Sequence, residues 1–486
     1  MDLILVLALL MPPLAAGVLA LVLRRVPRRV AWLNVLTIPI SLVAAGAIAV
    51  RLATGGASIV VGQLWRIDAL SGLLAVLIAS VAALAVTLGP GTDREHHWRD
   101  ADVRTFRIYV NLFAFTMLVA VSTVNLGLMW VAIEATTVTS ALLIPLQRTK
   151  ASVEASWKYL LIGSVGIALA FTGTVVAYVD FATTGVDINV ALDFTAMREA
   201  ATAFHPQVAR LAFVFLLVGF GTKAGLAPTH TWLPEAHSEA PSPLSAMMSG
   251  VLLAVALYAV MRWKTIIDLA VGSAFSDSLL LIVGTATLAV GSLSLLSQTH
   301  FKRLLAFSSI EHMGLACLGL ALGPLGTFAA LLHLTGHALV KSATFLLSGR
   351  VLHRFGSGTI SATRGLLATA PHTAVLFAAG IFALGGLPPF SLFVSEILIV
   401  KAGWAAGHPL LTTAVLILLL IAFGSLLVQL HRMLFGEAPS GITQGERATG
   451  AVLLLSVPVV VVAWLGVSIP APLQMLLSNA VLVVRP

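Results

Sequence analysis

Apolar segments long enough to cross a lipid bilayer recur along the whole chain. Of its 486 residues, 59% are hydrophobic and only 10% are charged. A membrane-spanning helix needs about 20 consecutive apolar residues, and segments of this kind begin near Met1, Val30, Ala69, Phe106, Leu126, Trp157, Val208, Leu244, Ser278, Arg303, Leu325, His372, Leu410 and Gly450. The pattern predicts an all-α polytopic membrane protein with about fourteen transmembrane helices, the first of them a retained helix rather than a signal peptide.

Basic residues cluster in alternate loops between these segments. Examples are Arg28, Arg104, Lys150 and Arg354. Lysine and arginine mark cytoplasmic loops, so the net charge of +8 is interpreted as a signal of orientation, and no nucleic-acid partner is predicted. With an even number of helices, both termini are expected on the outer side.

The chain has a single cysteine, Cys317, inside an apolar segment. One thiol excludes an internal disulfide and leaves no cysteine cluster for an iron–sulfur centre or structural zinc. We therefore expect no cofactor in this chain, and any electron transfer is expected in a partner.

Two segments carry the same interruption. The residues Gly-Leu-Ala-Pro228, followed by Pro234, resemble Gly-Leu-Pro388-Pro389, which lies five predicted helices further on. Proline removes a helical hydrogen bond, and broken helices at matching places indicate an inverted repeat around a mid-membrane pathway. This divides the chain into a three-helix segment (1–104), two five-helix repeats (105–265 and 266–436) and a C-terminal helix (437–486).

Two charged residues of the first repeat are predicted deep in the membrane. A charge at the centre of a membrane helix costs at least about 2.5–3.5 kcal/mol, so each such residue indicates a function. Glu134 lies well inside its helix, and Lys223 lies one turn before the first break. A lysine whose distance to a carboxylate can change is a proton site of adjustable affinity. The alternative is a static Glu134–Lys223 ion pair that holds two helices together.

The second repeat carries a stripe of titratable residues. His333, His337 and Lys341 follow at four-residue steps and therefore share one helix face. Histidine can accept a proton on one ring nitrogen and donate from the other, which suits a relay. The alternatives are packed, hydrogen-bonded histidines, or a metal site made by the histidine pair, although no acidic or thiolate ligand shares the stripe.

Three further residues near this stripe are candidates. Glu396 follows the second break and is predicted to be the proton outlet or, alternatively, a helix-capping carboxylate. Glu311 and His312 are expected deep in the membrane in relay or structural roles, whereas Lys302 and Arg303 are expected at the membrane interface.

The segment between the first break and Pro243 is rich in polar residues: His230, Glu235, His237 and Glu239. We interpret it as a hydrated proton entrance on the cytoplasmic side. The alternative is a rigid polar connector, because charged loop residues are usually solvated.

Three stretches resemble one known family: KAGLAPTHTWLPEAHSEAPSP (223–243), KRLLAFSSIEHMG (302–314) and FVSE (393–396). They are similar to the antiporter-like subunits of respiratory complex I, multisubunit sodium/proton antiporters and energy-converting nickel–iron hydrogenases, particularly the F-type subunit of hydrogenase-4-like complexes. The resemblance implies a proton-pumping subunit, not catalytic alone, in a prokaryotic cytoplasmic membrane. It also implies membrane and peripheral partner subunits that carry iron–sulfur and nickel–iron or other redox centres.

The resemblance also assigns roles to residues. It implies a hydrophilic axis in which Glu134 and Lys223 form the switching pair, His333, His337 and Lys341 the relay, and Glu396 the outlet. Several relatives have a lysine on the eighth helix where this chain has Ala254. Water, His230 or His312 must then bridge that gap.

Three hypotheses remain at this point. The first is a proton pump driven by a hydrogenase-like or complex-I-like partner. The second is sodium/proton exchange or inorganic-carbon transport without a redox partner, and the third is a structural anchor with a vestigial channel.

Overall fold

The computed structural model describes residues 1–23, 25–55, 57–92, 98–447 and 449–485. The first half of the chain forms α1 (Asp2–Val22), α2 (Pro27–Gly55), β1 (Ile59–Val61), β2 (Trp65–Ile67), α3 (Ala69–Thr87), α4 (Asp100–Ser122), α5 (Leu126–Ala141), α6 (Lys150–Ala182), α7 (Phe194–Ala200), α8 (Pro206–Lys223), α9 (Trp232–Glu239) and α10 (Ser242–Met247). The second half forms the π-helical turn η5 (Met248–Leu252), α11 (Leu253–Val271), α12 (Ser273–Leu295), α13 (Phe301–Ala321), α14 (Gly323–Phe355), α15 (Leu366–Thr369), α16 (Pro371–Leu384), α17 (Ser391–Ala405), α18 (Pro409–Leu434), α19 (Gly450–Val467) and α20 (Ala471–Val484).

The protein is a polytopic membrane protein of the all-α class, with one short β-hairpin. Within the described residues, 12 helices are long and apolar enough to cross a membrane. Two further crossings are built from two pieces each, α8 with α9 and α16 with α17. Each predicted apolar segment therefore corresponds to a helix or a broken helix. Several helices begin a turn or more earlier than predicted, as α4 and α6 do, because their first turns are polar and do not raise the apolar signal.

The two broken helices have the same backbone geometry. Leu226 N–H bonds to Gly221 O across the first break, and Leu387 N–H bonds to Phe382 O across the second, at the same five-residue spacing. A glycine with positive φ sits one residue before each of these donors, Gly225 (φ 74°) and Gly386 (φ 67°). Both breaks also contain a cis X-Pro bond, at Pro228 and Pro389. The prediction of two matching breaks is thus confirmed at Pro228, Pro388 and Pro389.

Pro234 is a correction to the sequence interpretation, since it does not interrupt a helix. It is the third residue of α9, which begins at Trp232. The first helical turn has no internal partner for its N–H groups, so proline fits there without breaking a hydrogen bond.

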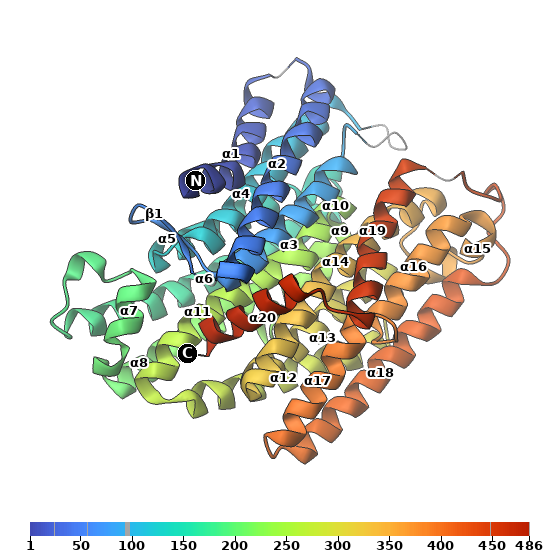
Figure 1. Cartoon of the computed structure of the whole chain (residues 1–486). Helices are drawn as coiled ribbons and strands as arrows, with labels where there is room; N and C mark the ends of the chain where they lie inside the picture. Colours follow the sequence, from blue (N-terminus) through green and yellow to red (C-terminus); the bar gives the residue numbers. More distant parts are fainter. Residues whose placement is uncertain (24, 56, 93–97, 448, 486) are drawn as a thin grey trace.

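Burial divides the bundle into a centre and a periphery. The apolar stretches of α10–η5–α11, α13 and α14 are 94–100% buried, whereas those of α1, α2, α6, α12, α18 and α19 are 28–39% buried. Figure 1 shows α13 and α14 within the bundle and α18 along its outer edge. Five of the predicted site residues, Glu311, His312, His333, His337 and Lys341, lie on the central helices α13 and α14, where the surrounding protein can pair them.

Three elements were missed by the sequence interpretation. The hairpin β1–β2 precedes α3, with Ile59 opposite Ile67. Helix α7 lies in the connection before α8, and α20 packs across α3, α2 and α14 near the C-terminus (Figure 1). None of the three is both long and apolar enough to cross the membrane, so the predicted number of crossings is unaffected.

Candidate functional site

Three buried histidines from two helices meet at the centre of the bundle. His312 Nδ1 lies 3.1 Å from His333 Nε2, and the His312 and His337 ring centroids are 5.2 Å apart. All three side chains are fully buried. The structure thus places His333 and His337 together, as the stripe on α14 predicted, and brings His312 between them from α13.

Ser395 on α17 fixes the direction of this histidine row. Its hydroxyl donates to Leu392 O (2.8 Å) and lies 2.9 Å from His333 Nδ1. A hydroxyl has one hydrogen, so Ser395 accepts from Nδ1–H, and His333 Nε2 is the bare nitrogen that faces His312. In this assignment His312 donates from Nδ1, and its Nε2 has no hydrogen-bond partner among the described residues.

Lys341 continues the row one helical turn beyond His337. Its Nζ donates to Leu305 O (3.0 Å) and to Ser308 Oγ (3.0 Å) on α13. The side chain is fully buried and has no carboxylate partner within 4.0 Å among the described residues. Lys341 is therefore a buried amine held by neutral oxygens, a setting in which the charged form loses most of its solvation.

Two carboxylates flank the histidines. Glu311 is 1% exposed, and its Oε2 lies 3.5 Å from His312 Nδ1 without a hydrogen-bond partner among the described residues. The Glu396 carboxylate contacts Gly386 at the second break and is close enough to Glu311 for their charges to interact. Glu396 is only partly buried. Glu311 and Glu396 therefore extend the histidine row to the second broken helix, and Glu396 brings the row toward the surface of the chain.

The first repeat holds a separate polar group around Lys223. Lys223 Nζ donates to Tyr159 OH (2.7 Å) and lies 4.6 Å from the centre of that ring. Tyr159 OH is 2.8 Å from Ser140 Oγ. The lysine is fully buried, so Tyr159 is the polar contact that anchors its amine.

Glu134 lies apart from Lys223. Its carboxylate accepts from Thr137 Oγ1 (2.9 Å) and Ser164 Oγ (3.2 Å), and it is partly exposed on the α5 surface. No ion pair within 4.0 Å joins Glu134 to Lys223 in the described chain. The static ion pair considered from the sequence is therefore not the arrangement in this structure, although the two charges remain within electrostatic range.

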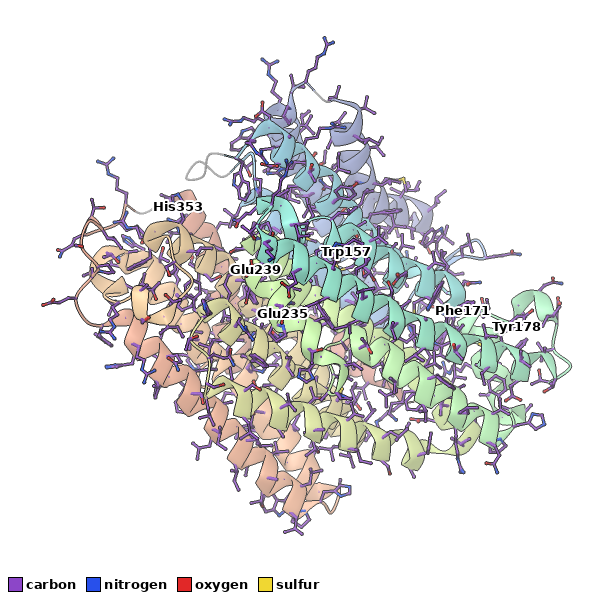
Figure 2. The ribbon with its side chains drawn as sticks, turned by 180° about the vertical axis from the view of Figure 1, so that it is seen from behind. Trp157, Phe171, Tyr178, Glu235, Glu239 and His353 are labelled. Carbon is purple, nitrogen blue, oxygen red and sulfur yellow. The ribbon has the colours of Figure 1, made fainter. Side chains whose placement is uncertain are left out.

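Helix α9 carries the residues predicted as an entrance. Glu235 forms an ion pair with Lys158 of α6 (2.9 Å), and Lys158 also pairs with Glu154. Figure 2 shows Glu235 and Glu239 together on the rear face, beside the α6 helix that carries Trp157. Of these carboxylates, Glu239 lines a cavity of about 760 Å³ between the helix ends.

The two histidines of this segment differ in burial. His230 is partly exposed, and no side chain among the described residues bonds to its Nδ1. His237 is fully buried between the rings of Trp232 and Phe345, at centroid distances of 6.1 and 5.5 Å. Among the described residues, the Leu233 backbone approaches this ring, and no side chain bonds to either ring nitrogen of His237. His237 is thus a buried imidazole inside the bundle rather than a residue of a solvated loop.

Lys302 differs from the sequence interpretation, which placed it at the membrane interface. It is 5% exposed, and its Nζ donates to Ser238 O (2.9 Å) and Ala240 O (2.5 Å) at the C-terminal end of α9. The end of α9 folds over the first turn of α13 and covers the amine, a contact that the sequence around Lys302 does not reveal. A cation at a helix C-terminus is favourably placed.

Lys302 connects the cavity to the histidine row. It lines the same cavity as Glu239, and His237 is within electrostatic range of both Lys302 and Lys341. The titratable residues therefore follow one another from the cavity to the second break: Glu239, Lys302, His237, Lys341, His337, His312, His333 and Glu396.

The gap at Ala254 persists in the structure. Ala254 is buried in α11, and among the described residues no hydrogen bond or ion pair joins Lys223 to the histidines. His312, which the sequence suggested as a bridge across this gap, lies instead beside His333 and His337. A polar link between η5 and α13 is formed by Ser249 and Ser309, whose Oγ atoms are 2.7 Å apart.

Known proteins share this architecture. Residues 123–422 match the model of the NADH:quinone oxidoreductase/Mrp antiporter transmembrane family. A hydrogenase-4 component F homolog of Methylacidiphilum infernorum is 36% identical over 353 residues, which cover 72% of this chain and 74% of the relative. Hydrogenase-4 component B of Escherichia coli is 30% identical over 346 residues, and the match spans 49% of that relative's length.

The fold of a solved complex is also similar. A chain of the Mrp complex from a Dietzia species superposes with a TM-score of 0.87 at 23% identity, over 100% of this chain and 98% of the other. This likeness concerns the fold, and the family model and the 36% identical relative establish the relationship in sequence. The chain belongs to the NADH:quinone oxidoreductase/Mrp antiporter transmembrane family.

Proposed function

We propose that this chain is a proton-translocating membrane subunit of a multisubunit redox complex of the hydrogenase-4 or complex I type. The observation that carries the proposal is the row of buried titratable side chains from the cavity at Glu239 to Glu396. Buried ionisable groups in membrane helices are costly and usually serve ion or proton transfer. The names of the relatives support the redox partner.

In this proposal protons enter from the cytoplasmic cavity at Glu239 and Lys302. His237 passes them to Lys341, and the histidines carry them to Glu311 and Glu396 at the second break. Each transfer needs a donor and an acceptor within hydrogen-bond reach or one water apart. His312 and His333 meet this condition directly, and water is required at the wider steps.

Lys223 and Glu134 act as the controlling pair. The Lys223 amine is held by the neutral Tyr159 hydroxyl rather than by a carboxylate, so its proton affinity depends on how near the Glu134 charge lies. A partner subunit that moves Glu134, which is partly exposed on α5, changes that affinity. The inverted repeats at 105–265 and 266–436 supply one control group and one relay.

The remaining assignments follow from this role. The iron–sulfur, nickel–iron or other redox centres belong to partner subunits, and the chain alone is not an enzyme. It lies in a prokaryotic cytoplasmic membrane, contacts lipids and other membrane subunits, and has both termini on the outer side.

The test uses the intact complex in proteoliposomes, with lumenal pH followed by a fluorescent dye during electron transfer. We expect Lys341→Met and Lys223→Met to abolish proton uptake, whereas Lys401→Met, an exposed lysine on α17, leaves it unchanged. Proton uptake that persists at the wild-type rate in both buried variants would reduce the chain to a structural anchor.

The second candidate is sodium/proton exchange, which the architecture shared with the Mrp complex favours. A sodium gradient imposed without an electron donor distinguishes the two functions. Proton movement under these conditions, lost in Lys341→Met, would support exchange, whereas movement only during electron transfer supports the redox-driven pump.

A further inference from the structure

Side chains from three helices converge beside the second break in an arrangement typical of a metal site. His312 on α13, His333 on α14 and Glu396 on α17 each offer one ligand atom, and these atoms lie within 4.8 Å of one another. Helix α14 packs against both α13 and α17 (Figure 1). From the sequence, a metal site at His333 and His337 was only an alternative to the relay, and no metal site was predicted; the structure brings His312 and a carboxylate to His333.

The distance between the two nitrogens fits a shared ion. Zinc binds imidazole nitrogen at about 2.0–2.1 Å with tetrahedral geometry, which sets two ligand nitrogens roughly 3.3 Å apart. His312 Nδ1 and His333 Nε2 are 3.1 Å apart. The imidazoles therefore need to separate by only a few tenths of an ångström to bind one ion.

The hydrogen bonds around His333 leave the correct nitrogen free. A ligating histidine usually donates its other N–H to an oxygen that fixes the tautomer. His333 Nδ1 lies 2.9 Å from Ser395 Oγ, which in turn donates to Leu392 O. The lone pair of Nε2 thus points toward His312.

His312 can release its own nitrogen without losing a hydrogen bond elsewhere. Its Nε2 is buried and has no hydrogen-bond partner among the described residues. A shift of the ring hydrogen from Nδ1 to Nε2 frees Nδ1 as a ligand and changes no net charge.

A second, unpartnered carboxylate lies beside the site. Glu311 Oε2 is buried, has no hydrogen-bond partner in the described chain, and lies 3.5 Å from His312 Nδ1. Two carboxylates neutralise a dication, whose burial would otherwise be costly. Imidazole ligands select transition metals such as zinc or cobalt over calcium and magnesium, which take oxygen ligands.

We propose that His312, His333 and Glu396 form a binding site for a transition-metal dication such as Zn²⁺, with the Glu311 carboxylate beside it. The partly exposed Glu396 is the side from which the ion enters. An ion bound here occupies the nitrogens that would carry protons, so zinc inhibits proton transfer. This last consequence rests on the proposed function, whereas binding itself does not.

Cobalt provides the test, because tetrahedral Co²⁺ with nitrogen ligands absorbs visible light. The purified full-length chain in detergent, stripped of metal with a chelator, is titrated with Co²⁺ and then with Zn²⁺. We expect one Co²⁺ per chain, a tetrahedral absorption spectrum, and loss of that spectrum when Zn²⁺ displaces the cobalt. Absence of stoichiometric binding to the wild-type chain overturns the proposal.

Variants locate the site. His312→Ala and His333→Ala are expected to weaken Co²⁺ binding at least tenfold, and Ser395→Ala by about 10–100-fold, as for other outer-shell partners. His408→Ala, which removes an exposed histidine, is the matched control and retains wild-type affinity. Wild-type affinity in His333→Ala contradicts the assignment.

A variant that gains an absorption band tests the site even if other variants lose binding because they fail to fold. Glu396→Cys exchanges one ligand for a thiolate and is expected to add a sulfur-to-cobalt charge-transfer band in the near ultraviolet. Binding of Co²⁺ without this band in a folded Glu396→Cys chain excludes Glu396 from the site. Because the titration requires no proton transport, its failure leaves the proposed function standing, and failure of the proton assay leaves the metal site standing.

Discussion

Replacing Asp68 by asparagine should destabilise the protein by about 3–5 kcal/mol, the typical cost of removing one partner of a buried ion pair. Asp68 accepts two hydrogen bonds from Arg262 of α11, at 2.6 and 2.8 Å, and caps α3 through Ser71 N–H. Asp68 is 8% exposed and Arg262 is 5% exposed. The substitution keeps the shape of the side chain and leaves the guanidinium charge buried without its counter-ion.

Other contacts of the Arg262 guanidinium remain in Asp68→Asn, so the destabilisation is expected near the lower end of this range. Arg262 also donates to Ser71 Oγ (2.8 Å) and lies over the rings of Phe194 (4.7 Å) and Tyr258 (4.8 Å). Such contacts stabilise a cation by about 0.5–2 kcal/mol each. We therefore expect an effect near 3 kcal/mol, which is about a hundredfold change in the unfolding equilibrium.

The assay is unfolding of the purified chain in mixed micelles, followed by far-ultraviolet circular dichroism. Asp100→Asn is the matched control, because Asp100 pairs with Arg28 at 3.2 Å but both side chains are more than 60% exposed. An exposed pair contributes about 0–1 kcal/mol. Equal effects of the two substitutions would refute the reasoning from burial.

The destabilisation caused by Asp68→Asn should decrease as the pH falls. Burial by itself raises the pKa of Asp68, but the charge and hydrogen bonds of Arg262 outweigh it and hold the pKa below its ordinary value. A carboxyl whose pKa is lowered by folding stabilises the fold above its unfolded-state pKa, and this contribution is lost as the pH falls through the folded-state value. The difference between wild type and Asp68→Asn should be full at neutral pH and shrink only in acid.

Three further predictions concern the site and one loop. Tyr159→Phe removes the 2.7 Å hydrogen bond to Lys223. Because a hydrogen bond to a charged group contributes about 1.5–3 kcal/mol, proton uptake should slow by about tenfold or more. Unchanged uptake in proteoliposomes would show that Tyr159 has no part in proton transfer. Gly386→Ala places a methyl group against the Glu396 carboxylate at a positive φ and should abolish uptake, whereas Gly46→Ala, which meets nothing within 4 Å, should leave uptake at the wild-type rate. Glu446→Gln weakens the bond from Arg350 (2.9 Å) that ties the loop before α19 to α14. Faster tryptic cleavage at Arg447 is the expected result, and an unchanged cleavage rate would contradict it.

Much of the fold could be predicted because membrane helices are determined by length and apolar composition. The same signal failed for α20, which follows Pro470 directly after α19 and was merged with it. The hairpin β1–β2 was missed because each strand has only three residues, too few for an alternating pattern.

The site could be predicted only along single helices. The four-residue spacing placed His333, His337 and Lys341 on one face, and their helix bears this out. The approach of His312 to His333 depends on how α13 packs on α14, and no local pattern contains that distance. Lys302 was misplaced for the same reason, because its burial comes from the end of α9, far away in the sequence.

The serine that orients His333 has a consequence for repeated turnover. In the proposed transfer, a proton that crosses the row of imidazoles leaves every ring with its hydrogen on the other nitrogen. Ser395 donates to Leu392 O, so the original order returns only after that hydroxyl and the rings have rotated back. This reset draws no energy from the partner, so a larger driving force would not make it faster.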